Sequence, residues 1–335
     1  MSVITDNSSI DLSLTNIWRA WVAFRRGKQP SRDIVAFEIN LEYNLLRLCA
    51  ELNTGQYEHS GYHHRIVNEK KRRDIAVASV RDRVVHRLLY DYLVPLVDSR
   101  LDYDVWSCRR NKGLHKALQR SQHLLSSSSH GWVWRADISK FFDHVEHNIL
   151  KRCLRRFVDD ERAQNLLDKV LASYIHNGDR QTDRQTDRQT RQGIPIGNLT
   201  SQIFANIYLN EFDRFVRHVL KPLGYVRYGD DFVLIMNTKA EAQRAQMIAT
   251  EWLATTLHLK VHLTNNIVVP VKAGLHFLGH IIHMNSPLAV DRRMLRKIER
   301  TVRMCNIASY KAMALPRRFA QRMPWLVTYN SEDTT

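Results

Sequence analysis

The sequence contains few of the cysteines that stabilise small secreted domains through disulfides, and few prolines and glycines. Its 335 residues contain 4 cysteines, 8 prolines and 12 glycines. The cysteines are far apart, at Cys49, Cys108, Cys153 and Cys305, and no Cys-x-x-Cys pair occurs. This spacing argues against a disulfide framework and against a cysteine-based zinc site. It predicts reduced thiols in a cytoplasmic protein.

Long apolar runs and negative charge are also scarce. No stretch approaches the roughly 20 apolar residues of a membrane-spanning helix, and the polar N-terminus lacks a signal-peptide core. Only 34 acidic residues face 50 Lys and Arg, which gives a net charge of +16. Such an excess favours a polyanionic partner through the release of counterions. The composition therefore predicts a globular protein that binds nucleic acid and not a membrane.

The length of 335 residues allows one large domain or two to three subdomains. Apolar periodicity predicts helices in two pieces over 12–55, over 79–101 with an end near Pro95, and over 115–125, 146–157, 160–175, 203–219 and 239–257. Apolar runs predict strands at 132–138, 260–271 and 276–282. Ser126–Ser129 is expected to be a linker. The tetrad Asp-Arg-Gln-Thr, repeated three times over 179–190, has no apolar residue and is expected to be a surface loop.

The most informative stretch is an acidic pair between two apolar segments. Apolar and aromatic residues flank Gly229-Asp230, which predicts a tight hairpin with Asp230 and Asp231 at its tip. A solvated turn fits this pattern equally well. A second acidic cluster begins with Asp137, at the end of the predicted strand at 132–138. If the fold brings Asp137 beside the hairpin, three carboxylates can bind Mg²⁺ for phosphoryl transfer.

Basic side chains gather in three segments that are candidates for contact with phosphate groups. Lys71 and Arg73 are two residues apart on an extended segment, so they point to one side and can bind a triphosphate. A solvated charge run explains them equally well. The loop at 106–113 and the segment at 291–322 are expected to contact nucleic acid. The residues concerned are Arg109, Arg110, Lys112, Arg296, Lys297 and Arg300.

A glycine-rich turn at 193–202 precedes the helix predicted at 203–219. Backbone N–H groups at such a junction can face a nucleotide or a template sugar. Capping of the helix by Asn198 or Thr200 is an alternative, and both interpretations can hold together.

Taken in order, these motifs resemble those of reverse transcriptases, from about residue 60 to 285. Ala136-Asp137 with Phe142 is similar to the first palm motif, and Tyr228-Gly229-Asp230-Asp231 to the Tyr-x-Asp-Asp hairpin. Phe277-Leu278-Gly279 resembles the later strand that grips the primer. The resemblance implies an α+β right-hand polymerase fold, with a helical extension over 1–60, fingers and palm over 61–285 and a helical thumb over 286–335. Within it, the fingers lie mainly at 61–130 and 150–200, and the palm mainly at 131–149 and 200–285.

The resemblance also implies an RNA-directed DNA polymerase with two Mg²⁺ ions, for which Mn²⁺ can substitute. Asp137, Asp230 and Asp231 are the expected catalytic residues, and they bind the ions together with the backbone of Ile138. The residues expected to bind the nucleotide are Lys71, Arg73, Phe142, Gly197 and Gln202. The residues expected to bind nucleic acid are Arg109, Arg110, Lys112, Ser201, Tyr228, Gly279, Arg296, Lys297 and Arg300. Phe142 would exclude a 2′-hydroxyl, although simple core packing is the alternative.

The segment Ile196–Gln202 indicates a subfamily. Its aliphatic-Gly-x-x-x-Ser-Gln form is similar to that of diversity-generating retroelement enzymes. Defence-associated bacterial reverse transcriptases have a similar sequence at this motif. The implied partners are a structured RNA template, a DNA or RNA primer, deoxynucleoside triphosphates and an accessory protein. Leu263–Asn266 stands where many relatives have a lysine that protonates pyrophosphate, which leaves Lys260 or His262 as substitutes. A non-catalytic nucleic-acid-binding protein and an untemplated or self-primed polymerase are the rival hypotheses.

Overall fold

The computed structural model describes residues 9–68, 72–174 and 191–301. Its contacts divide the chain into two compact units. The first consists of Met1–Asp102, Ser139–Phe215 and Glu251–Lys260, and the second of Tyr103–Ile138, Val216–Thr250 and Val261–Thr335. The chain therefore passes between the units several times. The expected subdomain limits at 60 and 285 stay predictions.

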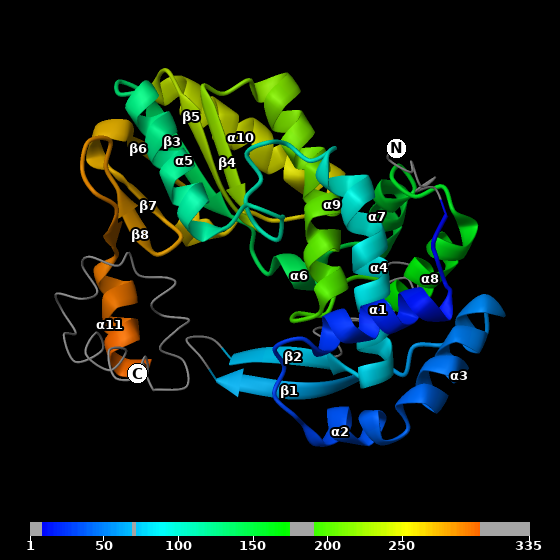
Figure 1. Ribbon diagram of the computed structural model, residues 1–335. Coiled ribbons are helices and arrows are strands. Elements are labelled where there is room, and N and C mark those ends of the chain that lie inside the picture. Colours follow the sequence, from blue (N-terminus) through cyan, green and yellow to red (C-terminus); the bar gives the residue numbers. More distant parts are fainter. Residues whose placement is uncertain (1–8, 69–71, 175–190, 302–335) are drawn as a thin grey trace, which may run out of the picture. The chain divides into compact units, whose positions relative to one another are not determined.

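The first unit is a group of helices with one two-stranded sheet (Figure 1). Its strands β1 (Tyr62–Asn68) and β2 (Arg72–Ala78) pair antiparallel. Its helices are α1 (Leu14–Arg25), α2 (Arg32–Ile39), α3 (Leu41–Asn53), α4 (Val80–Asp98), α6 (Phe141–His144), α7 (His147–Leu154), α8 (Glu161–Ala172) and α9 (Leu199–Phe215). Helix α4 contacts both α1 and α9 and buries Val84, Val85 and Leu89 completely. Burial of such side chains is the main source of stability for a helix in a protein.

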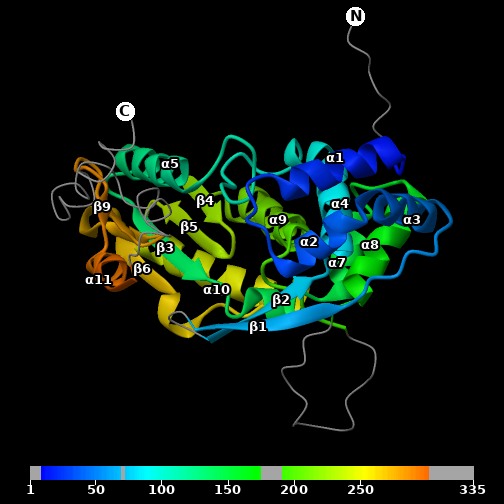
Figure 2. The ribbon, with the colours of Figure 1, turned by 60° about the horizontal axis from the view of Figure 1, so that its bottom comes forward.

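The second unit is built on a four-stranded antiparallel sheet in the order β4-β5-β3-β6. These strands are β4 (Gly224–Tyr228), β5 (Asp231–Met236), β3 (Trp132–Asp137) and β6 (Ile267–Pro270). Helices α5 (Leu114–Ser127) and α10 (Lys239–Thr256) lie against opposite faces of the sheet, as Figure 2 shows. The last residues of α10, from Glu251, group with the first unit. A π-helical segment, Val216–Leu220, precedes β4.

Side chains alternate between the two faces of this sheet because successive residues in a strand point to opposite sides. Val133, Val226 and Val233 join the buried cluster that includes Leu118 of α5. A smaller sheet of β7 (Leu275–Phe277), β8 (His280–Ile282) and β9 (Ala289–Val290) contributes to the same cluster, and α11 (Arg292–Thr301) follows it. The mixture of helices and antiparallel sheets is the predicted α+β class.

Two predicted helix limits are wrong at their C-terminal ends. Helix α4 continues through Pro95 to Asp98, because a proline in the last turn removes only one hydrogen bond before the helix ends. The expected serine linker begins inside α5, where the hydroxyls of Ser126 and Ser127 donate to the carbonyls of Gln122 and His123. The region 12–55 also forms three helices where two were predicted.

Two predicted strands are also wrong in extent. Within 260–271 only β6 is a strand, and Leu263–Asn265 forms a 3₁₀ turn. The segment 276–282 is a hairpin, because Leu278 and Gly279 have positive φ values of 51° and 76° and reverse the chain between β7 and β8. The Asp-Arg-Gln-Thr repeat lies outside the described residues.

Candidate active site

The acidic hairpin forms as predicted. Tyr228 and Asp231 are directly paired, which leaves Gly229-Asp230 as a two-residue turn between β4 and β5. Gly229 has a φ of 66°. A positive φ at the first central position is typical of the type II′ turn, which favours glycine there and matches the twist of the two strands. The local sequence therefore places Asp230 at the tip of the hairpin.

Asp137 lies beside this hairpin. Strands β3 and β5 pair so that Asp137 faces Asp231 directly, five residues along the register from the pair of Trp132 and Met236. Side chains of directly paired residues share one face of the sheet, with Cβ atoms about 4.5–5.5 Å apart. The predicted proximity of Asp137 to the hairpin carboxylates is therefore confirmed.

The three carboxylates repel one another electrostatically. Burial, followed by the negative charges of Asp137 and Asp231, raises the pKa of Asp230 from 3.8 to about 7. Burial and the charge of Asp137 raise the pKa of Asp231 to about 6. Like charges in a half-buried site disfavour the ionised form. A bound cation relieves that repulsion, so this arrangement can hold a divalent ion.

The contacts of Asp231 differ from those of the other two carboxylates. The carboxyls of Asp137 and Asp230 are close enough to share a hydrogen bond. Asp231 Oδ1 lies 3.6 Å from Arg135 Nη2, and this guanidinium opposes the rise in the pKa of Asp231. Asn265 donates from Nδ2 to Asp137 Oδ2 over 3.4 Å. In the described ranges no group of three or more His, Cys, Asp or Glu side chains is gathered for metal binding. Asp137 and Asp230 can nevertheless bind a hard cation such as Mg²⁺, because carboxylate oxygens are suitable ligands and neither carboxylate neutralises the charge of the other.

The backbone at Ile138 is oriented toward the hairpin. Its N–H donates to the carbonyl of Asp230 over 3.3 Å, while Asp137 and Ser139 make the backbone bonds to His262 and Lys260 on the other side. In extended chain the N–H and C=O of one residue point the same way. The Ile138 carbonyl therefore faces the side on which Asp230 lies, which is consistent with its predicted role as a metal ligand.

The predicted nucleotide-binding residues belong to the first unit, and their role stays a prediction. Lys71 lies outside the described residues, and Arg73 is placed only as part of β2. Phe142 is half-buried and packs edge-on against buried Phe141, at 5.3 Å between ring centroids. Partial exposure keeps both interpretations of Phe142, packing and steric gate, open.

The glycine-rich turn before α9 packs against β2. Gly197 has a φ of 96°, and an added Cβ would lie 3.0 Å from Ile75 Cγ2. Asn198, one of the two expected caps, donates its amide to the carbonyl of Ala76 over 2.7 Å. Gln202 is exposed, whereas Ser201 is buried and its hydroxyl has no partner within the described ranges. Helix α9 begins at Leu199, so Ser201 and Gln202 lie in its first turn and not in the predicted glycine-rich turn. Gln202 is thus exposed at the start of α9, just after the turn that packs against β2.

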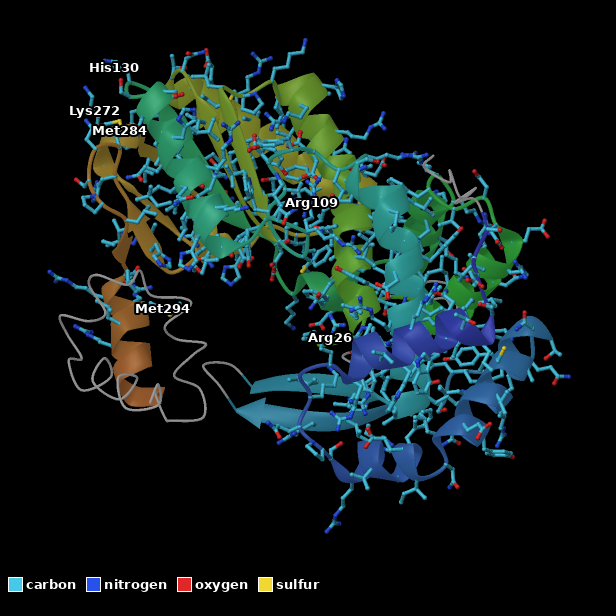
Figure 3. The ribbon with its side chains drawn as sticks, in the orientation of Figure 1. Arg26, Arg109, His130, Lys272, Met284 and Met294 are labelled. Carbon is cyan, nitrogen blue, oxygen red and sulfur yellow. The ribbon has the colours of Figure 1, made fainter. Side chains whose placement is uncertain are left out.

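Two cations of the basic loop bind the loop itself. Arg109, labelled in Figure 3, donates to the carbonyl of Val105 over 3.2 Å. Lys112 donates to the carbonyl of Tyr103 over 2.6 Å, and its ammonium lies 3.9 Å from the centre of the Trp106 ring. Arg110 is exposed. Contact of all three with nucleic acid stays a prediction.

The remaining predicted nucleic-acid contacts lie in the second unit. Tyr228 is half-buried on the same sheet face as Asp231, and burial raises the pKa of its hydroxyl. Gly279 is close to Met294 of α11, which is labelled in Figure 3: a Cβ added at Gly279 would lie 2.5 Å from Met294 Cε. Arg296 is exposed. The side chains of Lys297 and Arg300 lie outside what the structure describes.

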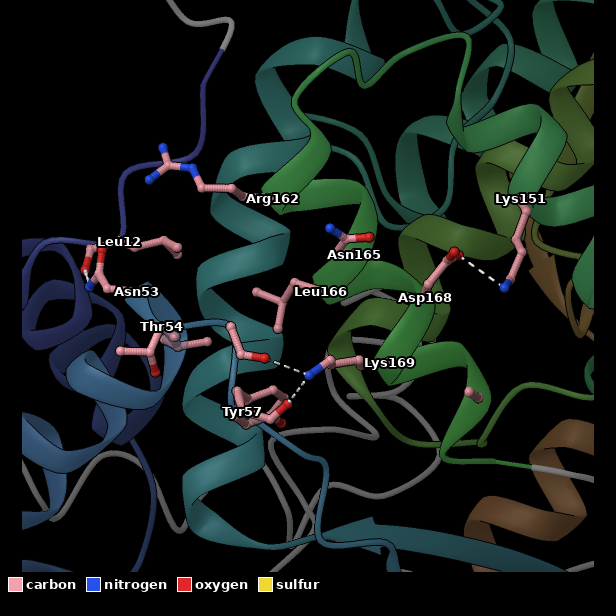
Figure 4. Close-up of a pocket in the computed structure, with 13 residues that line it drawn as sticks. Leu12, Asn53, Thr54, Tyr57, Lys151, Arg162, Asn165, Leu166, Asp168 and Lys169 are labelled. Atoms are coloured by element: carbon pink, nitrogen blue, oxygen red, sulfur yellow. Dashed lines mark hydrogen bonds and ion pairs between the residues drawn. The ribbon is translucent and has the colours of Figure 1, made fainter.

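A cavity of about 600 Å³ lies between α3 and α8 in the first unit (Figure 4), and none of the three carboxylates lines it. Its cations are already paired: Lys169 donates to the carbonyls of Gly55 and Tyr57 and to Glu58, and Lys151 lies 3.2 Å from Asp168. These contacts join α8 to the chain before β1, so the cavity is part of the scaffold.

Sequence reasoning missed the residues that hold the acidic side chains in place. Arg135 had a usable signal, because it lies two residues before Asp137 and period-two alternation puts both on one face. Asn265 and Ser107 had none, since their hydrogen bonds to Asp137 and Gly229 span 128 and 122 positions of the chain. Arg227 lies two residues before Gly229 in the hairpin itself, so its hydrogen bond to the Gly229 carbonyl is a local contact.

Comparison with known proteins agrees with this geometry. The family model described as reverse transcriptase (RNA-dependent DNA polymerase) matches residues 62–282. The chain belongs to the reverse transcriptase family. The match contains Asp137, Asp230 and Asp231, so the carboxylates lie inside the family domain.

Individual relatives of this reverse transcriptase family member are more distant. Protein YkfC of Escherichia coli (strain K12) is 27% identical over 246 residues, which are 63% of each chain. The group II intron-encoded protein LtrA of Lactococcus lactis subsp. cremoris is 25% identical over 150 residues, 44% of this chain and 24% of LtrA. The chain thus spans less than two thirds of the length of these curated relatives.

The fold is similar to that of a solved telomerase. The structure of apo telomerase from Candida tropicalis superposes with a TM-score of 0.50 at 11% identity, over 70% of this chain and 49% of that one. This similarity shows the polymerase fold. None of the helices in the described ranges combines the length and the apolar character needed to cross a bilayer.

Proposed function

We propose that this reverse transcriptase family member is an RNA-directed DNA polymerase, which copies RNA into DNA. The supporting observation is the direct pairing of Asp137 with Asp231 beside a hairpin tip that carries Asp230. Three acidic residues at one end of a sheet, with raised pKa values for two of them, are typical of a site that binds divalent cations for phosphoryl transfer.

Each carboxylate has its own role in this proposal. Asp137 and Asp230 hold divalent cations, Mg²⁺ with Mn²⁺ as a substitute, and the carbonyl of Ile138 is a further ligand. Asp231, paired with Arg135, orients the site and balances its charge. A bound cation would neutralise negative charge while a primer 3′-oxygen attacks the α-phosphorus of a deoxynucleoside triphosphate and pyrophosphate leaves.

The first unit supplies the nucleotide contacts in this proposal. Lys71 and Arg73 offset negative charge on the triphosphate, and Phe142 excludes a 2′-hydroxyl. Gly197 and Gln202 surround the templating base. Gln202 is exposed in the first turn of α9, directly after the turn that packs against β2, and β2 also carries Arg73; this supports the assignment.

Primer extension on a defined RNA template tests the activity. The wild-type chain should incorporate deoxynucleotides only with Mg²⁺ or Mn²⁺, and Asp230→Asn should lower the rate by at least about 10³-fold because a cation ligand is lost. Asp159→Asn, which changes an exposed acid, serves as the control. Equal rates for wild type and Asp230→Asn would refute the mechanism, and product made without template would identify an untemplated polymerase instead.

The biological setting of the proposed polymerase is a retroelement or an antiviral defence system. The aliphatic-Gly-x-x-x-Ser-Gln form of Ile196–Gln202 supports a diversity-generating or defence-associated enzyme, with a structured RNA template, a primer and an accessory protein as partners. Sequencing the RNA that copurifies with the chain tests this, because a single structured RNA encoded beside the gene is expected. A diverse RNA population would contradict it. A cytoplasmic location stays a prediction from the sequence.

A further inference from the structure

We propose that Ser107 and Arg227 are positioning residues for Asp230. They hold both peptide groups of Gly229 and thereby fix the direction in which the hairpin presents the Asp230 carboxylate. The inference rests on the proposed polymerase function and adds a device that keeps its catalytic turn in one conformation.

The contacts fall on consecutive peptide groups of the turn. The Ser107 hydroxyl oxygen accepts a hydrogen bond from the Gly229 N–H at 2.8 Å. Arg227 Nη1 donates to the Gly229 carbonyl at 3.0 Å. The next carbonyl, that of Asp230, accepts from the N–H of Ile138. Because the peptides on both sides of Gly229 are held, neither its φ nor its ψ can change without breaking a bond.

Glycine makes such a clamp necessary. Gly229 has a φ of 66°, and an added Cβ would meet none of the described residues within 4 Å. No side-chain packing therefore restrains this residue in the described part of the chain, and glycine has the widest choice of backbone conformations. Hydrogen bonds from outside the turn supply the restraint that a side chain would otherwise give.

Ser107 is itself fixed by a strand-like segment along the edge of the sheet. Strand β4 is the edge strand, and Val105 forms a parallel bridge with Arg227. The N–H of Arg227 donates to the Asp104 carbonyl, and the N–H of Trp106 donates to the Arg227 carbonyl, both at 2.9 Å. The segment therefore has a defined register on β4, which delivers Ser107 to the turn.

Asp104 anchors the segment 104–107 through its carboxylate. Its carboxylate accepts from Arg120 Nε at 2.7 Å and from Arg217 Nη2 at 2.9 Å, and the residue is 2% exposed. Two guanidinium partners give a buried carboxylate strong, directional bonds. Asp104 thus ties the edge segment to α5 and to the π-helical segment before β4.

Arg227 acts by a hydrogen bond to the backbone and not by neutralising the charge of the carboxylates. It is completely buried and pairs with Phe232, so it projects from the sheet face opposite to Tyr228 and Asp231. From that face its guanidinium reaches the carbonyl of Gly229. Keeping a guanidinium out of water is costly, and an apolar residue would pack there more cheaply. A positioning role explains why the site keeps it.

Small displacements of this carboxylate are expected to matter. A misplacement of about 1 Å in an active site can lower the rate by about 10²-fold. Loss of either bond lets the Gly229 peptides rotate, so Asp230 spends less time beside Asp137. The expected signature is a lower kcat and weaker binding of divalent cation, with an unchanged KM for the deoxynucleotide.

Three variants of the full chain test the role of Ser107. Ser107→Ala should lower kcat by about tenfold and raise the Mg²⁺ concentration that gives half of the cation-induced rise in Tm. Ser107→Thr keeps the hydroxyl and should restore both values. Ser121→Ala removes another buried hydroxyl of the same unit, one that bonds only within α5, and should match wild type.

Arg227→Lys tests the second bond, since lysine keeps the charge but lacks the fork that reaches the carbonyl. It should show the same rise in the Mg²⁺ midpoint. Wild-type kcat and Mg²⁺ midpoint in Ser107→Ala, or an equal loss in Ser121→Ala, would overturn the proposal. If the wild-type chain extends no primer, the proposed function fails, whereas the Mg²⁺ midpoint from Tm still decides the positioning role.

Discussion

The raised pKa of Asp230 links the stability of the protein to pH. Its pKa of about 7 lies above the ordinary 3.8, so between these values the folded state keeps a proton that the unfolded state has lost. The free energy of unfolding must therefore fall as pH rises through this window. At pH 8 without divalent cations, Asp230→Asn should raise Tm by about 2–4 °C, because the amide cannot ionise.

Thermal unfolding at several pH values checks this prediction. The difference between Asp230→Asn and wild type should disappear below about pH 3, where the carboxyl is neutral in both states. Saturating Mg²⁺ at pH 8 should stabilise wild type but not the variant. The exposed control Asp159→Asn should follow wild type throughout. A lower Tm for Asp230→Asn at pH 8 would contradict the electrostatic origin of the pKa.

Arg135 provides the second prediction for a single residue. Its guanidinium lies 3.6 Å from Asp231 and lowers the pKa that burial and Asp137 raise. The rise in Tm that Mg²⁺ causes should depend on pH, because the carboxylates must be ionised to bind the cation. Arg135→Gln should therefore raise the pH at which this rise is half of its maximum by about one unit. Arg135→Lys keeps the positive charge and should stay close to wild type. An unchanged midpoint in Arg135→Gln would show that the ion pair does not tune the carboxylates.

The residues of the site differ in how far the sequence could reveal them. Asp230 and Asp231 were predictable because a Gly-Asp step between apolar strands defines a turn locally. Arg135 was predictable in principle from strand alternation beside Asp137. Ser107 was not, because its bond to Gly229 spans 122 positions in the chain. Local pattern carries no information about a contact of that kind.

At the scale of elements, turn chemistry decides which predictions succeed. The hairpin β4–β5 was predicted because glycine stands where φ is positive. The hairpin β7–β8 was missed because Leu278, an apolar residue within an apolar run, occupies a positive φ of 51°. An apolar side chain in the left-handed region is uncommon and needs support from packing. Here Leu278 packs against the buried cluster of the second unit, which the sequence could not show.

The turn at Gly229 gives a prediction at the same scale. The methyl group of Gly229→Ala would meet none of the residues that the structure describes, so the expected cost is that of holding an L-residue at a φ of 66°. That conformation costs about 1–2 kcal/mol, and Tm should fall by about 2–4 °C. Gly229→Asn should cost less because asparagine tolerates positive φ. A larger loss for Asn than for Ala would show that the turn is limited by space and not by backbone conformation.

At the scale of the whole molecule, the sequence predicted the α+β class and the acidic cluster, whereas the grouping of segments came only from the fold. Tyr103–Ile138 and Val261–Thr335 are separated by more than a hundred residues, yet they belong to one unit with the hairpin. Their association depends on pairing between β3 and β6, which is non-local. Strand partners of this kind cannot be read from periodicity alone.

The net charge of +16 gives the last prediction. If binding of an RNA–DNA duplex neutralises 6–10 phosphates, affinity should fall by about 10³–10⁵-fold between 50 and 200 mM salt. Arg296, exposed on α11, is expected to make one such contact. Arg296→Gln should therefore reduce the slope of log affinity against log salt by about one. Lys272→Gln, which removes an exposed cation from the 3₁₀ turn after β6, is the matched control for loss of charge. Equal changes of slope in both variants would mean that the protein binds through its overall charge and not through a surface that includes α11.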